Sequence, residues 1–198
     1  NAGQKITLQE DIYSGSQDQL NGTEISVSGG NAILRWTQTL SDRSDVVIQQ
    51  YFDKTHRQIP GTFEEDLDTY DFDFQHRLSL FDNHTMVWGL GFRYSNDNVQ
   101  NSVFLAFLPP YLATRLYSGF LQDEITIVPD RLRMTIGSKF EHNSFSGFEF
   151  QPAIRFSWIF HESQMLWWAV SRAVRTPSRI DRDFYFPSMI PVGGRNEG

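Results

Sequence analysis

The sequence of 198 residues has no cysteine, few basic residues and no long apolar run. Without cysteine, neither a disulfide framework nor a thiolate metal site is possible. The 17 Lys and Arg residues are scattered and outnumbered by 24 Asp and Glu residues, which argues against a nucleic-acid partner because phosphate binding requires concentrated basic charge. No segment approaches the roughly 18 apolar residues of a transmembrane helix, and residues 1–5 lack signal-peptide features, so we expect a mature or excised chain.

Aromatic residues, by contrast, are abundant: they make up 15% of the chain, and 17 of them are Phe. The mean hydropathy is nevertheless negative. A membrane protein is still compatible with this value, because a transmembrane β-strand exposes only alternate residues to lipid. The aromatic excess therefore requires a surface on which these rings can lie.

Apolar residues recur at every second position, which is typical of β-strands. Residues 70–80 give the clearest case: Phe72, Phe74, Leu78 and Leu80 fall on one face, whereas Asp71, Asp73, Gln75, Arg77 and Ser79 fall on the other. Only His76 interrupts the apolar face. Similar alternation occurs in residues 31–40, 45–57, 85–94, 116–127, 132–141, 148–160 and 166–170. The chain is thus predicted to be all-β, an antiparallel up-and-down meander of about eight strands.

The predicted connections alternate in length along the chain. Short turns lie near residues 42, 82, 129 and 162, and longer connections cover 58–63, 97–113, 143–148 and 176 onward. All short turns therefore fall at one end of the sheet. The strands reach ten or more residues, which is longer than usual in soluble sheets and is the length that crosses a bilayer at a tilt. Together these features indicate part of a larger transmembrane β-barrel.

Charges of both signs occupy the predicted polar face in mid-strand. They are Arg35, Asp71, Asp73, Arg77, Arg93, Glu124, Arg133, Lys139, Glu141 and Arg155. A lumen filled with water or protein would solvate these charges. An ordinary antiparallel sheet with one solvated face also produces alternation, but it must bury its aromatic face against a second sheet.

Three motifs resemble the barrel of TonB-dependent receptors. Residues 137–141 have the pattern G-x-K-x-E, residues 147–155 have G-x-E-x-x-P-x-x-R, and residues 171–178 have S-x-A-x-R-x-P-S, in the order and spacing of that family. Residues 118–124, with the sequence SGFLQDE, resemble another strand of the family, and residues 88–93 add support. The resemblance covers about residues 30–180.

The resemblance implies that residues 1–198 form one partial barrel domain. In this family an N-terminal plug domain lies inside a barrel of twenty-two strands, and no plug motif is visible here, so we expect a middle piece. The implied function is energised uptake of a scarce nutrient such as an iron chelate across the bacterial outer membrane. The implied partners are outer-membrane lipid, the plug and the rest of the barrel, the TonB complex acting through the plug, and a small-molecule ligand at extracellular loops. No catalytic, cofactor-binding or metal-binding residue is carried over, and no cofactor is expected.

Several groups of residues are candidates for a functional site. The acidic run Glu64, Glu65, Asp66, Asp68, Asp71 and Asp73 suits a hard cation, but it lacks the glycine pattern of a calcium loop, so a position at the rim and lumen is favoured. The histidines, which are His56, His76, His84, His142 and His161, lie singly in the sequence, without the spacing of a zinc site. Glu124 and Glu141 suit glycoside hydrolysis, yet neighbouring Arg133 and Lys139 favour charge compensation.

Aromatic residues also cluster near the predicted turn at His161. Trp158, Trp167 and Trp168, with Phe156 and Phe160, are interpreted as an interfacial aromatic belt, although a soluble core is the alternative. Residues 104–111 are apolar for a connection and are expected to contact ligand, plug or a neighbouring loop.

Two other functions remained open. A complete small outer-membrane barrel of about eight strands, acting as an adhesin or enzyme, is disfavoured by the polar tail at residues 193–198 and the missing terminal aromatic strand. A soluble β-sandwich that binds carbohydrate is disfavoured by the length and regularity of the strands.

Overall fold

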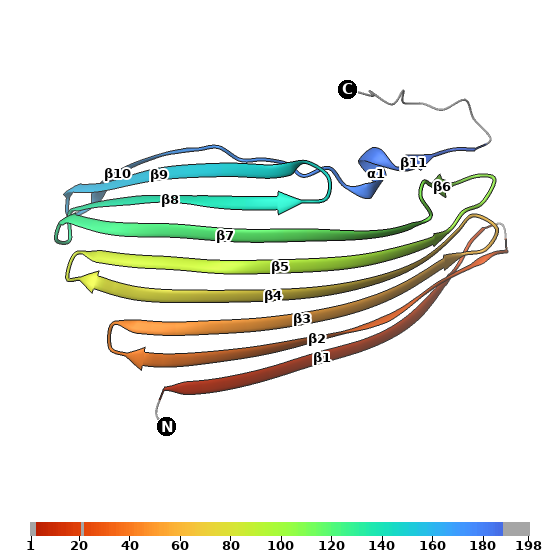
Figure 1. Ribbon diagram of the computed structural model, residues 1–198, viewed down its shortest axis with the longest axis horizontal. Helices are drawn as coiled ribbons and strands as arrows, with labels where there is room; N and C mark the ends of the chain where they lie inside the picture. Colours follow the sequence, from red (N-terminus) through yellow and green to blue (C-terminus); the bar gives the residue numbers. More distant parts are fainter. Residues whose placement is uncertain (1–2, 21, 188–198) are drawn as a thin grey trace.

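The computed structural model describes residues 3–20 and 22–187, and nine of its strands form one antiparallel sheet. These strands, which pair in sequence order, are β1 (Gln4–Asp18), β2 (Glu24–Ser41), β3 (Ser44–Ile59), β4 (Phe63–Phe81), β5 (His84–Gln100), β7 (Tyr111–Val128), β8 (Leu132–Asn143), β9 (Gly147–His161) and β10 (Gln164–Ser171). A two-stranded sheet joins β6 (Ala106–Phe107) to β11 (Phe184–Tyr185), and α1 (Arg179–Arg182) precedes β11. The up-and-down meander is confirmed (Figure 1).

The sheet is a single open layer. Strands β1 and β10 lie at its opposite edges and do not pair with each other (Figure 1). Among the described residues there is no second large sheet against which it packs, and only Val99, Ala106 and Phe107 are buried apolar residues. The described residues therefore form neither a closed small barrel nor a β-sandwich, which excludes both alternative folds for this part of the chain.

The two faces of the sheet differ as the alternation predicts. Cross-strand registers place Phe72, Phe74, Trp88, Phe156 and Trp158 on one side, named here the aromatic face. The opposite side, the polar face, carries Asp71, Arg77 and Lys139. Rings contact one another along the aromatic face, as in the pairs Phe74–Trp88 at 5.1 Å and Phe140–Phe150 at 5.2 Å between centroids. Such cross-strand aromatic pairs stabilise a sheet that has no buried core.

His76, a polar residue in the middle of the aromatic face, has partners on both neighbouring strands. Trp88 Nε1 donates a hydrogen bond to His76 Nδ1 at 3.1 Å. Because an indole N–H can only donate, Nδ1 must be the unprotonated nitrogen, and Nε2–H then donates to Ser44 Oγ at 2.8 Å. A neutral imidazole with both nitrogens paired is compatible with an apolar surface.

The strands are longer and more numerous than predicted. Strand β1 was missed because Glu10 interrupts the alternation of Ile6, Leu8 and Ile12. The connections near 58–63 and 143–148, predicted to be long, are tight turns between strands that continue to Ile59 and Asn143. Near the turn at 60–62, polar residues such as His56, Glu64 and Asp66 replace apolar residues on the aromatic face, so the hydrophobic period fades there before the backbone ladder ends.

The predicted belt around His161 is only partly correct. Trp158 and Trp168 lie on the aromatic face, where Trp168 contacts Phe156 at 6.2 Å. Trp167 pairs with Ser157 and therefore lies on the polar face. Adjacent residues of a strand face opposite sides of the sheet, so Trp167 and Trp168 cannot both belong to one aromatic belt.

Candidate functional site

The polar face carries ion pairs in the middle of its strands. Arg93 Nε lies 2.6 Å from Asp71 Oδ2, and the Asp71 residue is only 8% exposed. Lys139 Nζ lies 2.7 Å from Glu141 Oε1, and Gln151 donates a hydrogen bond to the same carboxylate at 2.5 Å. These partners compensate charges that are partly removed from water. The face is thus suited to contact with water or another polar surface.

The carboxylates considered for glycoside hydrolysis do not form a pair. Glu124 lies opposite Thr135, whereas Glu141 lies opposite Ser118 several rows away. Each has a separate cation, since Arg133 lies 4.0 Å from Glu124 and Lys139 lies 2.7 Å from Glu141. The predicted charge compensation is confirmed.

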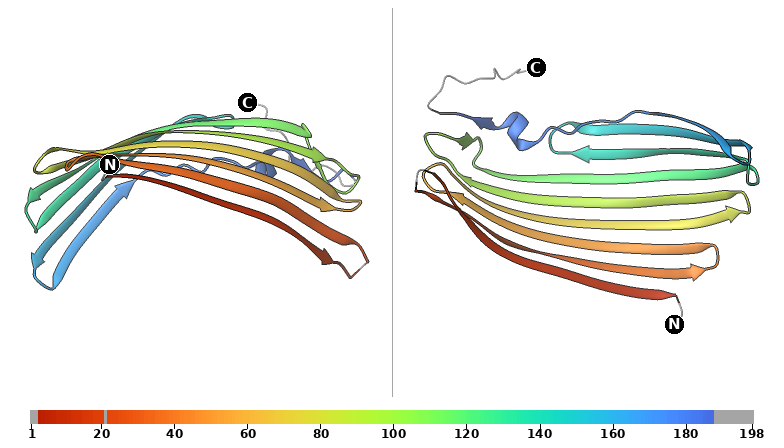
Figure 2. Two further views of the ribbon diagram at one scale, coloured as in Figure 1. Left: turned by 90° about the horizontal axis from the view of Figure 1, so that it is seen from below. Right: turned by 180° about the vertical axis from the view of Figure 1, so that it is seen from behind.

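Two distant segments meet over the polar face at the end of the sheet opposite the short turns, named here the loop end. One is the connection between β5 and β7, which contains β6, and the other is the segment 172–186 that follows β10. Figure 2 shows the segment with α1 on the concave side of the curved sheet. The two segments pair through β6 and β11, and Leu108 N donates to Asp183 O at 2.9 Å. The apolar residues 104–111 therefore contact a neighbouring loop, as one of the predicted alternatives stated.

Aromatic rings form a small core at this contact. Phe107 is 6% exposed, and its ring lies 6.3 Å from that of Phe63 and 5.5 Å from that of Phe184. The ring of Phe186 extends the cluster, at 4.9 Å from Phe184. The main burial of apolar side chains in the described residues is thus at the loop end and not within the sheet.

Arg179 anchors the segment 172–186 to the wall. Its Nη1 lies 2.6 Å from Asp97 Oδ2, and the two side chains are 11% and 14% exposed. The guanidinium also lies 5.0 Å from the centre of the Phe107 ring, a cation–π distance. Asp183 lies 3.8 Å away, and the Pro109 carbonyl accepts a hydrogen bond from the same guanidinium. One side chain thus links α1, β5 and the β6 connection.

The short helix α1 begins with a capping box. Ser178 Oγ accepts a hydrogen bond from Asp181 N, and Ser178 N donates to Asp181 Oδ2. The Ser178 backbone N–H and hydroxyl both donate to Asp181 Oδ2 and lower the pKa of Asp181, with a further contribution from the Arg175 guanidinium. The local sequence Ser178–Asp181 therefore fixes the point at which the chain turns toward Arg179.

Burial affects a carboxyl group beside this contact. Desolvation, and then the charge of Asp97, raises the pKa of Glu65, while Arg57 and Arg179 act in the opposite direction. Glu65 and Asp97 both lie on the polar face. The loop end therefore contains more acidic charge near Arg179 than a single ion pair requires.

A cavity of about 260 Å³ lies between the segment 172–186 and the sheet. Its walls include Arg93, Asn143, Ser144, Phe145 and Thr176. Asn143 is 5% exposed, and its Nδ2 donates hydrogen bonds to Ser146 Oγ at 2.8 Å and to Thr176 Oγ1 at 3.5 Å. The cavity lies on the same face as the ion pairs, with Arg93 in its wall.

A family model described as TonB dependent receptor-like, beta-barrel matches residues 4–196. This chain belongs to that family of TonB-dependent receptor barrels. The match includes the motifs on β8 and β9 and the motif at 171–178. No curated protein matches the chain.

Solved TonB-dependent receptors share the fold. The siderophore receptor PirA from Pseudomonas aeruginosa matches with a TM-score of 0.60 and 14% identity, over 90% of this chain and 40% of that one. The ferric citrate transporter FecA, in its unliganded form, matches with a TM-score of 0.58 and 14% identity, over 86% of this chain and 33% of that one. The chain thus spans less than half the length of either receptor.

No helix among the described residues of this receptor barrel is long and apolar enough to cross a membrane.

The acidic run, predicted to lie at the rim and lumen, is divided between the two faces of the sheet, because alternate residues of a strand face opposite sides. Glu65, Asp71 and Asp73 lie on the polar face, whereas Glu64, Asp66 and Asp68 lie on the aromatic face near the loop end. Sequence reasoning recognised the acidic run but did not separate these two groups.

The histidines lie singly in the sequence, but two of them pair with an aspartate across the sheet. His56 Nδ1 lies 2.9 Å from Asp66 Oδ1, and His84 Nδ1 lies 2.7 Å from Asp123 Oδ2. These partners are on adjacent strands, ten and thirty-nine residues away in the chain. Spacing within one segment cannot reveal such pairs, because the strand register brings them together.

Proposed function

We propose that this chain is part of the transmembrane wall of an outer-membrane receptor that takes up a scarce nutrient, such as an iron chelate. In this proposal residues 1–198 contribute a partial barrel, and other segments of the protein supply the remaining strands and a plug domain. The TonB complex supplies energy through the plug. The role of this chain is binding and gated transport, without catalysis.

The main support for this proposal is the difference between the aromatic face and the polar face. The aromatic face has partly exposed rings and aliphatic side chains over the middle of every long strand, and hydrocarbon is the solvent that suits it. The polar face holds ion pairs such as Arg93–Asp71, which a plug or water solvates. Strands of 15 to 19 residues exceed the roughly 10 that cross a bilayer, so their polar ends extend beyond it.

The cargo is proposed from the relatives and from the loop end. PirA is described as a siderophore receptor and FecA as a ferric citrate transporter, so both handle iron chelates. In this chain the segment 172–186 covers part of the polar face and leaves a cavity beside Arg93. We expect the ligand to pass over this surface, between the loops and the plug.

Matched substitutions on neighbouring residues test the placement in the membrane. In the full-length receptor, Phe74→Arg places a charge on the aromatic face and is expected to cost about 2–4 kcal/mol of barrel stability. Gln75→Arg adds the same charge on the polar face and is expected to leave assembly unchanged. Folded receptor in outer-membrane fractions is measured from its heat-dependent gel mobility. Equal assembly of the two variants would contradict the placement.

Uptake tests the transport proposal. We expect deletion of the full-length receptor to abolish accumulation of radioactive iron from at least one member of a panel of ferric chelates. Complementation restores the signal, and a protonophore removes it because uptake is energised. Unchanged accumulation from every chelate after deletion would overturn the iron-chelate proposal.

A further inference from the structure

The aromatic face becomes polar where β3 and β4 approach the loop end. Tyr70 is the last ring of β4 on this face, and Asp68, Asp66 and Glu64 follow at every second position. Asp66 lies four residues beyond Tyr70, or about 14 Å along the strand. If the aromatic face meets hydrocarbon, these carboxylates lie above it, at the level of the lipid headgroups.

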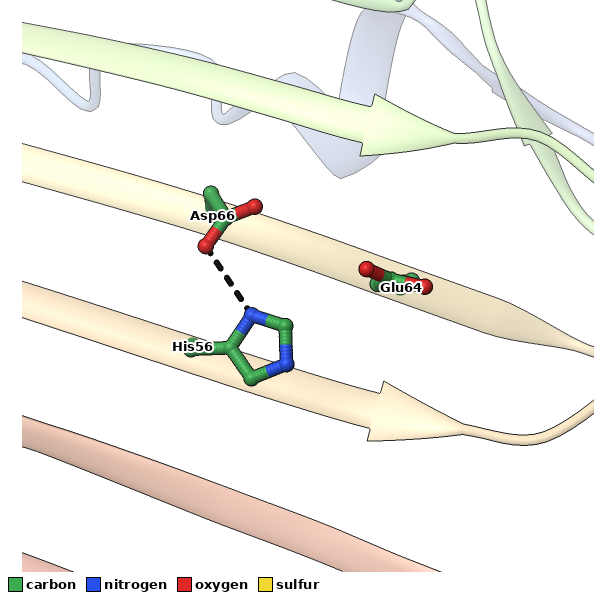
Figure 3. Close-up of side chains that lie close together, drawn as sticks. All are labelled: His56, Glu64 and Asp66. Carbon is green, nitrogen blue, oxygen red and sulfur yellow. Dashed lines mark hydrogen bonds and ion pairs between the residues drawn. The ribbon is translucent and has the colours of Figure 1, made fainter.

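Three potential metal ligands gather at this position (Figure 3). His56 Nδ1 lies 2.9 Å from Asp66 Oδ1, and one ligand atom each from His56, Asp66 and Glu64 lies within 4.8 Å of the other two. The side chains of His56 and Asp66 are 32% and 43% exposed, so a cation from solvent has access. This is the single group of three such residues found in the part of the chain that the structure describes.

The backbone holds these three residues in a fixed relation. His56 pairs with Asp66 across β3 and β4, and Gln58 pairs with Glu64. Asp66 and Glu64 are two residues apart on one strand, so they share a face. The connecting turn has Gly61 at a φ of 72°, a conformation that favours glycine, and this turn fixes the register of the hairpin.

The surroundings favour a cation. Asp68, the next carboxylate on this face, has Lys54 Nζ at 3.5 Å, and apart from His56 no other cationic partner of Asp66, Asp68 or Glu64 is found among the described residues. Asn96 Oδ1, opposite Asp68 on β5, is a buried acceptor without a hydrogen bond in that same part of the chain. Carboxylates therefore outnumber basic groups on this patch.

An ordinary His–Asp pair elsewhere in the sheet provides a comparison. His84 and Asp123 lie 2.7 Å apart with side chains 30% and 22% exposed, but no third metal-ligating residue completes that pair within the described residues. Charge compensation of an aspartate by a histidine involves only these two residues. Glu64, held near His56 and Asp66 while it accepts a hydrogen bond from Gln58 Nε2 at 3.2 Å, is not explained by such compensation.

We propose that His56, Glu64 and Asp66 bind one divalent cation of the zinc class on the outer surface of the barrel wall. An imidazole with two carboxylates suits zinc and similar transition metals, whereas calcium requires six to eight oxygen ligands. Zinc–ligand bonds of about 2.0–2.2 Å require the Glu64 carboxylate to move closer by rotation of its side chain, and water completes the coordination. The bound cation links β3 to β4 at headgroup level and is distinct from any iron transported through the lumen.

Metal stoichiometry of the purified full-length receptor tests the site. The receptor is treated with chelator in detergent, dialysed against Zn²⁺ in the presence of excess Mg²⁺ and Ca²⁺, and analysed by mass spectrometry of its metal content. We expect His56→Gln and Glu64→Gln each to bind one equivalent fewer than the unmodified receptor, or to bind that equivalent at least about tenfold more weakly. His84→Gln is the matched control and should retain it.

Two results would overturn the proposal. One is equal zinc content in His56→Gln and the unmodified receptor, and the other is an equal loss in His84→Gln, which would indicate nonspecific binding. Heat-dependent gel mobility confirms that each variant is folded. Because zinc content is measured without uptake, the outcome is independent of the test of iron-chelate transport.

Discussion

The two ends of the sheet are stabilised in different ways. At the short-turn end, adjacent strands are joined by turns such as 82–83 and 129–131, and neighbouring turns are linked by exposed contacts such as Arg43 Nη2–Asp82 Oδ1 at 2.7 Å. At the loop end, Arg179 reaches Asp97 across 82 residues of sequence, and Phe184 packs on Phe107. One rim is thus built from short hairpin turns with exposed contacts between them, and the other from nearly buried contacts between distant segments. Perturbations at the two ends should therefore differ in size and in extent.

The largest effect is expected from Arg179→Met. This change leaves Asp97 nearly buried without its cation, and loss of one partner of a buried pair costs about 3–5 kcal/mol. Hydrogen exchange of residues 172–186 in the full-length receptor should then accelerate by at least about 100-fold, while the short-turn end is unchanged.

Arg175→Met is the matched control for this experiment. Arg175 also pairs with a carboxylate, Asp181 at 2.9 Å, but its side chain is 82% exposed. Exposed pairs contribute little to stability, so exchange should stay near that of the unmodified receptor. Equal acceleration in both variants would show that the Arg179–Asp97 contact is not the anchor.

A smaller, local effect is expected at the short-turn end from Asp130→Gly. Asp130 is the one described non-glycine residue with a positive φ, at 58°. Glycine relieves the left-handed strain but loses more conformational entropy, so thermal stability of the receptor should rise by less than about 1 kcal/mol. Asp42→Gly, in a turn without a positive φ, should not stabilise. A gain from both variants would contradict the role assigned to φ.

The smallest effect concerns the pH dependence of the loop end. Because the folded-state pKa of Glu65 is raised above its usual 4.5, its protonated form is favoured by the fold. The contribution of Glu65 is fully favourable below the unfolded pKa and is lost as pH rises through the folded pKa. Hydrogen-exchange protection of residues 172–186 should therefore increase slightly between neutral pH and about pH 4.5.

Glu65→Gln removes the titrating group and should flatten this part of the profile. Asp181, whose pKa is lowered, acts in the opposite direction, because its contribution is present above its unfolded pKa of 3.8 and is lost only as pH falls through the still lower folded value. Glu65 and Asp181 therefore affect stability in different pH ranges. An unchanged pH slope in Glu65→Gln would exclude Glu65 as the source.

Sequence reasoning succeeded where one face of a strand is continuously apolar. The segment around Phe72 and Phe74 was placed correctly because each side chain in that region alternates between two distinct environments. It failed for β1, where Glu10 breaks the pattern, and for Trp167, which lies between Leu166 and Trp168 on one strand and therefore faces the opposite side of the sheet. The partners of His56 and Arg179 were also missed, because they are set by strand register and by packing of segments far apart in the chain.

By itself, the sequence determined the class of fold, the two-faced character of the sheet and the family, since hydrophobic period and short motifs are properties of neighbouring residues. The tertiary structure decided which charges pair, how the segment 172–186 covers the polar face, and how His56 meets Glu64 and Asp66. The physical reason is that ion pairs and ligand clusters depend on distances of a few ångströms between strands. Such distances follow from the register and curvature of the assembled sheet.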